Sequence, residues 1–151
     1  MVKVRRAEEG DIEGLLAIER TCFGRERFNR RMLLVLLAAD NVESYLGMEE
    51  DKVMASAFLL LDGDRKRSRI LSLAVLPERR GLGYGRVLLL HLEERARIGC
   101  STLMTLEVRV TNVQAINMYL HHGYSIEGTI RHYFGKGQDA IYMEKRLVET
   151  S

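Results

Sequence analysis

The chain has 151 residues, of which 46% are hydrophobic and 29% are charged, and its formal net charge is +2. These values are typical of a globular protein, and we expect a single domain over residues 1–151. The small net charge argues against a nucleic-acid partner, and the lack of an apolar run of roughly 20 residues argues against a membrane helix, so we expect a cytoplasmic protein.

The first third of the chain predicts a strand, two helices and a hairpin. Apolar and basic residues alternate over residues 2–6, which predicts a strand. Asp11 is placed to cap a helix that runs to about Cys22, and Asn29 is placed to cap a second helix that ends near residue 40. A period of two then predicts strands over residues 43–49 and 52–61.

The remainder predicts an alternation of strands and helices. After a turn at residues 62–64, we expect a strand over residues 70–75, a helix over 83–98 and a strand over 102–110. A helix over 112–122 and closing strands over 124–130 and 140–147 follow. The order β-α-α-β-β-β-α-β-α-β-β predicts an α/β fold in which a central mixed sheet is flanked by helices.

A glycine-rich turn joins the strand at 70–75 to the helix at 83–98. Glycines at every second position, Gly81, Gly83 and Gly85, can adopt positive φ and leave backbone N–H groups unshielded. The helix N-terminus and nearby arginines add positive charge, so a phosphate-bearing ligand is indicated. The spacing matches neither a dinucleotide-binding motif nor a P-loop. A flexible connection with solvated arginines is the alternative.

Two motifs resemble those of the GNAT acetyltransferase superfamily. Residues 80–85 read Arg-Gly-Leu-Gly-Tyr-Gly and match the family's pyrophosphate loop, Arg/Gln-x-x-Gly-x-Gly/Ala. Residues 112–124 match its second signature, Asn-x-x-Ala-x-x-x-Tyr-x-x-x-Gly-Phe/Tyr. The resemblance, which is tightest from Ser68 to Tyr124, implies a GNAT-like fold, acetyl-CoA as cosubstrate and an N-acetyltransferase activity.

Three further segments resemble the N-terminal (α-amine) acetyltransferases, such as the bacterial ribosomal-protein-alanine enzymes and their archaeal relatives. They are residues 18–23, 106–109 and 133–143. The last segment departs from the relatives' pattern at Phe134, Lys136 and Gln138, where two carboxylates and one aromatic hydroxyl are replaced. The resemblance therefore implies a protein or peptide N-terminus as the acceptor, while the departures leave the preferred peptide open.

The resemblance also implies how acetyl-CoA is held. Backbone N–H groups of the glycine turn would bind the pyrophosphate, and the preceding strand would pair with the pantetheine arm where the two central strands of this family splay apart. The N–H near Val75 would meet the oxyanion. Asn112 would contact the pantetheine, although a helix N-cap would satisfy the same side chain. The expected cosubstrate-binding residues are Leu73, Ala74, Val75, Arg80, Gly81, Leu82, Gly83, Tyr84, Gly85, Arg86 and Asn112.

Glu107 and Tyr119 are the expected catalytic residues. Glu107 shares one face of its strand with Thr105 and Arg109, and a carboxylate on a strand covered by helices must be paired or face a wet cleft. It is either the general base or a structural partner of Arg109. Tyr119 stands where the family has the tyrosine that reprotonates the leaving thiolate, and its alternative role is packing at the sheet edge.

The expected acceptor-binding residues are Phe23, Tyr133 and Tyr142. Deprotonating a lysine at neutral pH costs about 3 kcal/mol more than deprotonating an α-amine, which favours N-terminal acceptors. A protein-lysine or small-molecule amine acetyltransferase is the alternative within enzymes, and a non-catalytic acetyl-CoA-sensing module is the alternative outside them. Two cysteines and four histidines complete no metal-ligand pattern, so no metal is expected. The oligomeric state stays open between monomer and homodimer.

Overall fold

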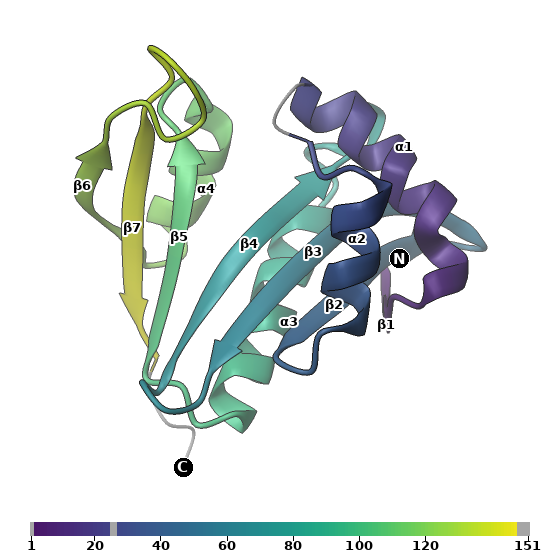
Figure 1. Ribbon diagram of the computed structural model, residues 1–151, viewed down its shortest axis with the longest axis horizontal. Helices are drawn as coiled ribbons and strands as arrows, with labels where there is room; N and C mark the ends of the chain where they lie inside the picture. The colour runs from purple at the N-terminus through teal and green to yellow at the C-terminus, as the bar shows by residue number, and fades with distance from the viewer. Residues whose placement is uncertain (1, 25–26, 148–151) are drawn as a thin grey trace.

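A seven-stranded mixed sheet forms the centre of the protein, and the computed structural model describes residues 2–24 and 27–147 (Figure 1). The strands are β1 (Lys3–Arg6), β2 (Val42–Glu49), β3 (Lys52–Asp62), β4 (Arg67–Val75), β5 (Leu103–Arg109), β6 (Ser125–Ile130) and β7 (Ala140–Arg146). The helices are α1 (Ile12–Phe23), α2 (Arg30–Ala38), α3 (Tyr84–Ile98) and α4 (Val113–His121). Short 3₁₀ turns cover Glu9–Asp11 and Pro77–Arg79. The predicted order of elements and the mixed α/β architecture are confirmed.

The sheet opens at the pair β4 and β5, which is the one parallel pair among the described strands. The strand order is β1-β2-β3-β4-β5-β7-β6, and all described neighbours other than β4 and β5 are antiparallel. The β4–β5 pairing runs only from Arg67 opposite Leu103 to Ile70 opposite Leu106. Beyond this point the two strands diverge (Figure 1). The second half of β4 therefore pairs with β3 on one side and has no described strand partner on the other.

Helices cover the two faces of the sheet unequally. Leu88, Leu89 and Leu92 of α3 pack in one core cluster, which also includes Ile70 and residues of α4. Leu71, the next residue of β4, belongs instead to the cluster under α1 and α2. Because α1 and α2 lie over β2, β3 and β4 (Figure 1), β5 is covered on its α4 face only. The expectation that helices cover both faces of this strand was wrong, and its other face borders a cleft.

Two of the three predicted helix caps are present. The side chain of Asn29 accepts a hydrogen bond from Met32 N, and that of Asn112 accepts one from Ala115 N. Asp11 does not cap α1, because a 3₁₀ turn precedes the helix and the Asp11 carboxylate caps that turn instead. It accepts from Glu8 N at 2.8 Å and pairs with Arg5 at 2.7 Å.

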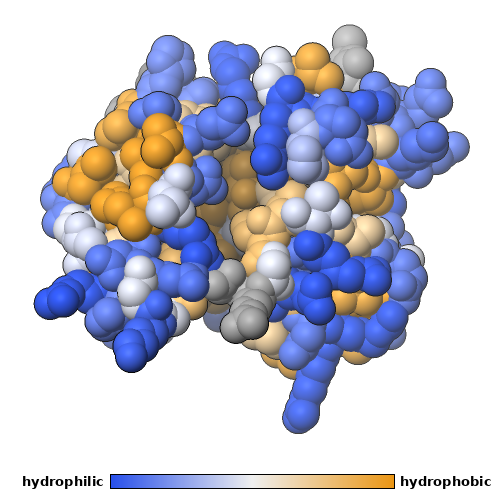
Figure 2. Space-filling model, turned by 90° about the horizontal axis from the view of Figure 1, so that it is seen from above, coloured by the Kyte–Doolittle hydropathy of each residue, from blue (hydrophilic) through white to orange (hydrophobic). Residues whose placement is uncertain are grey.

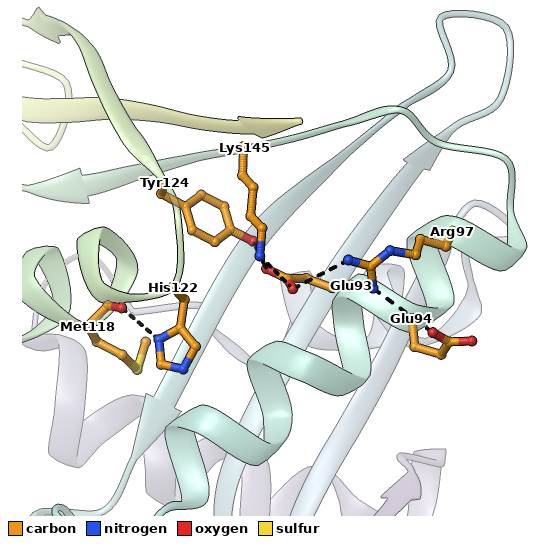
Figure 3. Close-up of polar contacts among 7 residues, drawn as sticks. All are labelled: Glu93, Glu94, Arg97, Met118, His122, Tyr124 and Lys145. Atoms are coloured by element: carbon orange, nitrogen blue, oxygen red, sulfur yellow. Dashed lines mark hydrogen bonds and ion pairs between the residues drawn. The ribbon is translucent and has the colours of Figure 1, made fainter. Parts of the chain in front are cut away.

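A buried carboxylate links α3 to the far half of the sheet. Glu93, which is 1% exposed, accepts hydrogen bonds from Tyr124 Oη at 2.7 Å and from Lys145 Nζ at 3.0 and 3.1 Å (Figure 3). Arg97 approaches the same carboxylate at 4.0 Å. A buried charge that is paired and hydrogen-bonded avoids most of the cost of leaving water. Glu93 therefore supplements the short β4–β5 junction as a connection between the two halves.

Two absences within residues 2–24 and 27–147 bear on the expected function. No described helix is both long and apolar enough to span a membrane. No group of three or more His, Cys, Asp or Glu side chains in these ranges is arranged to hold a metal ion.

Candidate active site

A cleft of about 1030 Å³ lies where β4 and β5 diverge. It is lined by α1, β4, the glycine turn, β5, α4 and the loop between β6 and β7, and the view from above shows a hollow between the two halves (Figure 2). The predicted site residues on its wall are Phe23, Leu73, Ala74, Val75, Arg80, Gly81, Gly83, Tyr84, Gly85, Arg86, Glu107, Asn112, Tyr119 and Tyr133. The structure thus brings together residues from separate segments of the chain.

The glycine turn has the conformation that a phosphate-binding loop requires. Gly81 and Gly83 have φ values of +80° and +91°, and Gly83 directly precedes α3. The first N–H groups of this 15-residue helix have no acceptor within the helix. A Cβ atom at either glycine would meet nothing within 4 Å, so the turn borders open space. These features fit the pyrophosphate of acetyl-CoA.

Two of the three arginines near the turn already have protein partners. Arg79 is paired with Glu49 at 2.8 Å, and Arg80 donates from Nε to the Val75 carbonyl at 3.0 Å. No hydrogen bond or ion pair reaches Arg86 within the described part of the chain. Arg86 is therefore the guanidinium that remains available to a phosphate group.

The open edge of β4 offers backbone groups to an extended ligand. The Val75 carbonyl points into the gap, where it accepts from Arg80 and lies 3.6 Å from Cys22 Sγ. In a strand, alternate residues present their backbone groups to the same side, so the N–H groups of Leu73 and Val75 also face the gap. This edge can pair with a pantetheine arm as with an additional strand.

Glu107 is paired with Arg69 of β4, not with Arg109. Its Oε1 lies 2.8 Å from Arg69 Nε and 2.6 Å from Arg69 Nη2. Arg69 and Glu107 project from the same face of neighbouring strands where these strands part, whereas Arg109 is two residues farther along. Arg109 instead contacts Gln138 and lies over the Phe134 ring at 5.0 Å. No polar contact to Glu107 Oε2 occurs among the described residues, which leaves this oxygen for a ligand.

Tyr119 is a buried hydroxyl on the opposite wall of the cleft. The residue is 5% exposed, and its ring packs edge-on against Tyr124 with centroids 5.5 Å apart. Burial raises the pKa of Tyr119 above its ordinary value, because the phenolate would lose hydration. The hydroxyl therefore keeps its proton at neutral pH, as a general acid must.

The structure separates the predicted acceptor-binding residues. Phe23 and Tyr133 line the cleft from opposite sides. Tyr142 is not among the lining residues, because its hydroxyl is directed to Glu144 Oε2 at 2.7 Å. Burial and this carboxylate raise the pKa of Tyr142 to about 12. Leu82, predicted to bind the cosubstrate through its backbone, is 63% exposed and also lies outside the cleft wall.

Sequence reasoning assigned no role to two charged residues in the cleft. Arg69 was part of a basic run next to a predicted strand, and the structure places it inside β4. A charge within a strand pattern is the signal that could have identified it. Glu19 was noted only within the segment that resembles the N-terminal acetyltransferases, and nothing in that pattern showed that its side chain is buried.

Glu19 is a carboxyl group with one satisfied oxygen. The residue is 1% exposed, and its Oε1 accepts from Phe28 N at 2.7 Å, which connects the end of α1 to the segment before α2. Its Oε2 has no hydrogen-bond partner within the described residues. Burial raises the pKa of Glu19 from 4.5 to about 7, because a buried carboxylate loses its hydration.

We expect Glu19→Gln to stabilise the protein at alkaline pH. A carboxyl whose pKa is raised on folding contributes stability that is fully present below about pH 4.5 and is lost as the pH rises to about 7. Glutamine keeps an acceptor for Phe28 N and cannot ionise. The quantity to compare is the free energy of unfolding of the variant minus that of the parent. This difference should be larger at pH 8 than at pH 4, by up to about 3 kcal/mol. Urea unfolding over this pH range measures the difference.

Glu13→Gln on the same helix is the matched control, because the Glu13 side chain is 69% exposed. This variant also replaces a carboxyl by an amide, but at the protein surface. A Glu19→Gln stability difference with the same pH dependence as that of Glu13→Gln would contradict the assigned titration.

Comparison with known proteins identifies relatives over most of the chain. The model of the acetyltransferase (GNAT) family matches residues 12–124. An uncharacterized N-acetyltransferase of Methanocaldococcus jannaschii is 31% identical over 144 residues, covering 95% of this chain and 90% of that protein. An N-alpha-acetyltransferase of Sulfurisphaera tokodaii is 37% identical over 83 residues, covering 54% of this chain and 50% of that protein.

Among solved structures, the ribosomal-protein-S18-alanine N-acetyltransferase from Escherichia coli superimposes with a TM-score of 0.87. The match covers 100% of this chain and 97% of that one at 22% sequence identity. At this identity the likeness shows a common fold.

Proposed function

The chain belongs to the acetyltransferase (GNAT) family, and from this premise we propose that it transfers the acetyl group of acetyl-CoA to the α-amine of a protein N-terminus. An acetyl-CoA-dependent acyltransferase activity follows from the family. The acceptor is the proposed part. The observation that carries it is the half-engaged Glu107 carboxylate, whose Oε2 is open to the same cleft that Tyr119 lines. The N-alpha-acetyltransferase among the relatives supports the same acceptor.

Binding of the cosubstrate is assigned to the glycine turn and the open strand edge. The N–H groups of the turn and of the first turn of α3 would hold the pyrophosphate, with Arg86 adding a full positive charge. The N–H groups of Leu73 and Val75 would fix the pantetheine arm and bring the thioester to the point where the strands part. The Val75 N–H is then a preorganised donor for the carbonyl oxygen as charge develops on it.

Two side chains would transfer the protons of the reaction. Glu107 would accept a proton from the acceptor, directly or through water, as its nitrogen bonds to the carbonyl carbon. Tyr119 would donate its proton to the sulphur as the carbon–sulphur bond breaks, and it recovers that proton from solvent. The products are an amide and the free thiol of CoA. The proton that Glu107 collects returns to solvent, which balances the reaction.

The chemistry of the acceptor favours an α-amine. An α-amino group has a pKa of about 7.7–8.0, whereas that of lysine is about 10.4. A group that is already partly neutral at physiological pH needs less help from a base than lysine does.

The experiment that tests the proposal uses two peptide pools and acetyl-CoA. One pool has free α-amines and dimethylated lysines, and the other has blocked N-termini and free lysines. We expect thiol release and acetylated peptides, located by mass spectrometry, in the first pool only. Acetylation confined to the second pool would move the assignment to lysine. If neither pool is acetylated although CoA still binds, peptides are excluded as acceptors. The protein would then act on small amines or be a non-catalytic module.

A further inference from the structure

An arginine and a glutamate lie side by side at the base of the cleft. Arg69 is one residue before Ile70, which forms the last β4–β5 pair with Leu106, and Glu107 is one residue after that pair. Ile70 and Leu106 both pack in the core cluster of α3. Side chains alternate along a strand, so Arg69 and Glu107 both project from the opposite face, toward α1 and α2. The two charges therefore occupy one side of the sheet, in contact at 2.6 and 2.8 Å.

The pair leaves one nitrogen of the guanidinium and one oxygen of the carboxylate available. Both Arg69 nitrogens that reach Glu107 converge on Oε1. Among the described residues, no hydrogen bond involves Arg69 Nη1 or Glu107 Oε2. The Arg69 side chain is 39% exposed and that of Glu107 is 10% exposed, so the guanidinium is the more accessible of the two groups. The base of the cleft thus offers one guanidinium nitrogen and one carboxylate oxygen together.

The loop between β6 and β7 fixes the orientation of this guanidinium. Tyr133 Oη accepts from Arg69 Nη2 at 2.5 Å. The loop itself is closed by internal hydrogen bonds, including Phe134 N to Gln138 O at 3.0 Å and His132 N to Asp139 Oδ1 at 3.0 Å. A guanidinium held in one plane keeps its remaining donor, Nη1, in a fixed direction, where it can donate to a carboxylate oxygen.

We propose that Arg69 selects acceptors whose first residue is aspartate or glutamate, an inference that rests on the proposed N-terminal acetyltransferase function. The acceptor amine would lie at Glu107 Oε2, and the side-chain carboxylate of the first residue would accept a hydrogen bond from Arg69 Nη1. Such residues place an amine and a carboxylate only a few bonds apart, matching the adjacent charges of the pair. Lysine or arginine in the first position is repelled by the same guanidinium.

The test compares peptides that differ only in their first residue. Aspartate is compared with asparagine, and glutamate with glutamine, because each pair has nearly the same shape and differs in charge. We expect kcat/KM to be about 10- to 100-fold higher for the acidic member, the range for hydrogen bonds to charged groups. Equal kcat/KM values within each pair would overturn the inference. Faster transfer to free aspartate than to the peptides would also overturn it, because the acceptor would then be a free amino acid.

Variants at Arg69 separate selection from a merely structural role. Since Arg69 also contacts Glu107, Arg69→Gln should lower the rate with every peptide, and the informative quantity is the Asp/Asn ratio. We expect this ratio to fall to about 1 in Arg69→Gln and to be partly retained in Arg69→Lys, which keeps the charge without the planar fork. Arg67→Gln is the matched control, because Arg67 is on the same strand and outside the cleft wall. An unchanged ratio in Arg69→Gln would leave Arg69 as a structural partner of Glu107 only.

The outcomes distinguish failure of this inference from failure of the proposed function. Acetylation of α-amines without any acidic preference contradicts the role of Arg69 and leaves the function standing. Acetylation of lysine side chains alone contradicts the function itself.

Discussion

We expect Tyr119→Phe to lower kcat by about 100- to 1,000-fold, within the range for loss of a positioned general acid. The change removes one hydroxyl from a residue that is 5% exposed and lines the cleft. The aromatic ring and its packing against Tyr124 are kept, so the KM for acetyl-CoA should change little. Steady-state kinetics with acetyl-CoA and an acceptor peptide measure both parameters.

Tyr45→Phe is the control for this variant. Tyr45 is 6% exposed, and this change likewise removes one hydroxyl from a buried tyrosine, here one that donates to Glu43 Oε1 at 2.6 Å. Tyr45 does not line the cleft. Its kcat should match that of the parent at a temperature where both proteins are folded. If Tyr119→Phe also kept the parent kcat, the leaving thiolate would take its proton from another source, and Tyr119 would be a packing residue.

Replacing Gly81 and Gly83 together by alanine should raise the Kd for CoA by about 100-fold. A left-handed backbone conformation costs an L-residue about 1–2 kcal/mol at each position, so the loop is expected to relax toward negative φ. That change turns the N–H groups of the loop away from a common centre. Isothermal titration calorimetry gives the Kd directly. The stabilisation by saturating CoA in a thermal scan should shrink accordingly.

Gly63→Ala is the matched control for the loop variant. A Cβ at Gly63 also meets nothing within 4 Å, but this glycine does not have a positive φ and lies in the turn between β3 and β4, away from the cleft. It should bind CoA as the parent does. A double variant that retains parent affinity would show that the arginines and the strand edge, not the glycine backbone, hold the cosubstrate.

Much of the fold could be predicted because local signals agreed with the overall arrangement. Asn29 and Asn112 begin helices as their side chains predict, and the glycine turn leads from a strand into a helix as its residues require. The motifs at 80–85 and 112–124 lie on the expected elements, and both border the same cleft. These features depend on residues that are close together in the sequence, so the sequence alone predicts them.

What could not be predicted depends on contacts between distant segments. The partner of Glu107 is Arg69, 38 residues away, and it is selected by strand pairing and not by spacing. The burial of Glu19 arises from packing of the chain before α2, which no periodicity within α1 reveals.

The short β4–β5 junction also bears on how long the protein persists in a cell. Four residue pairs join these strands, and the rest of this β4 edge is the part that we propose acetyl-CoA completes. A ligand that binds only the native state adds about 2.7 kcal/mol of stability at 100 times its Kd. Proteolysis proceeds through open forms, whose population falls as stability rises. Supply of the acetyl donor would thus regulate the abundance of the enzyme as well as its turnover, and starvation would deplete both together.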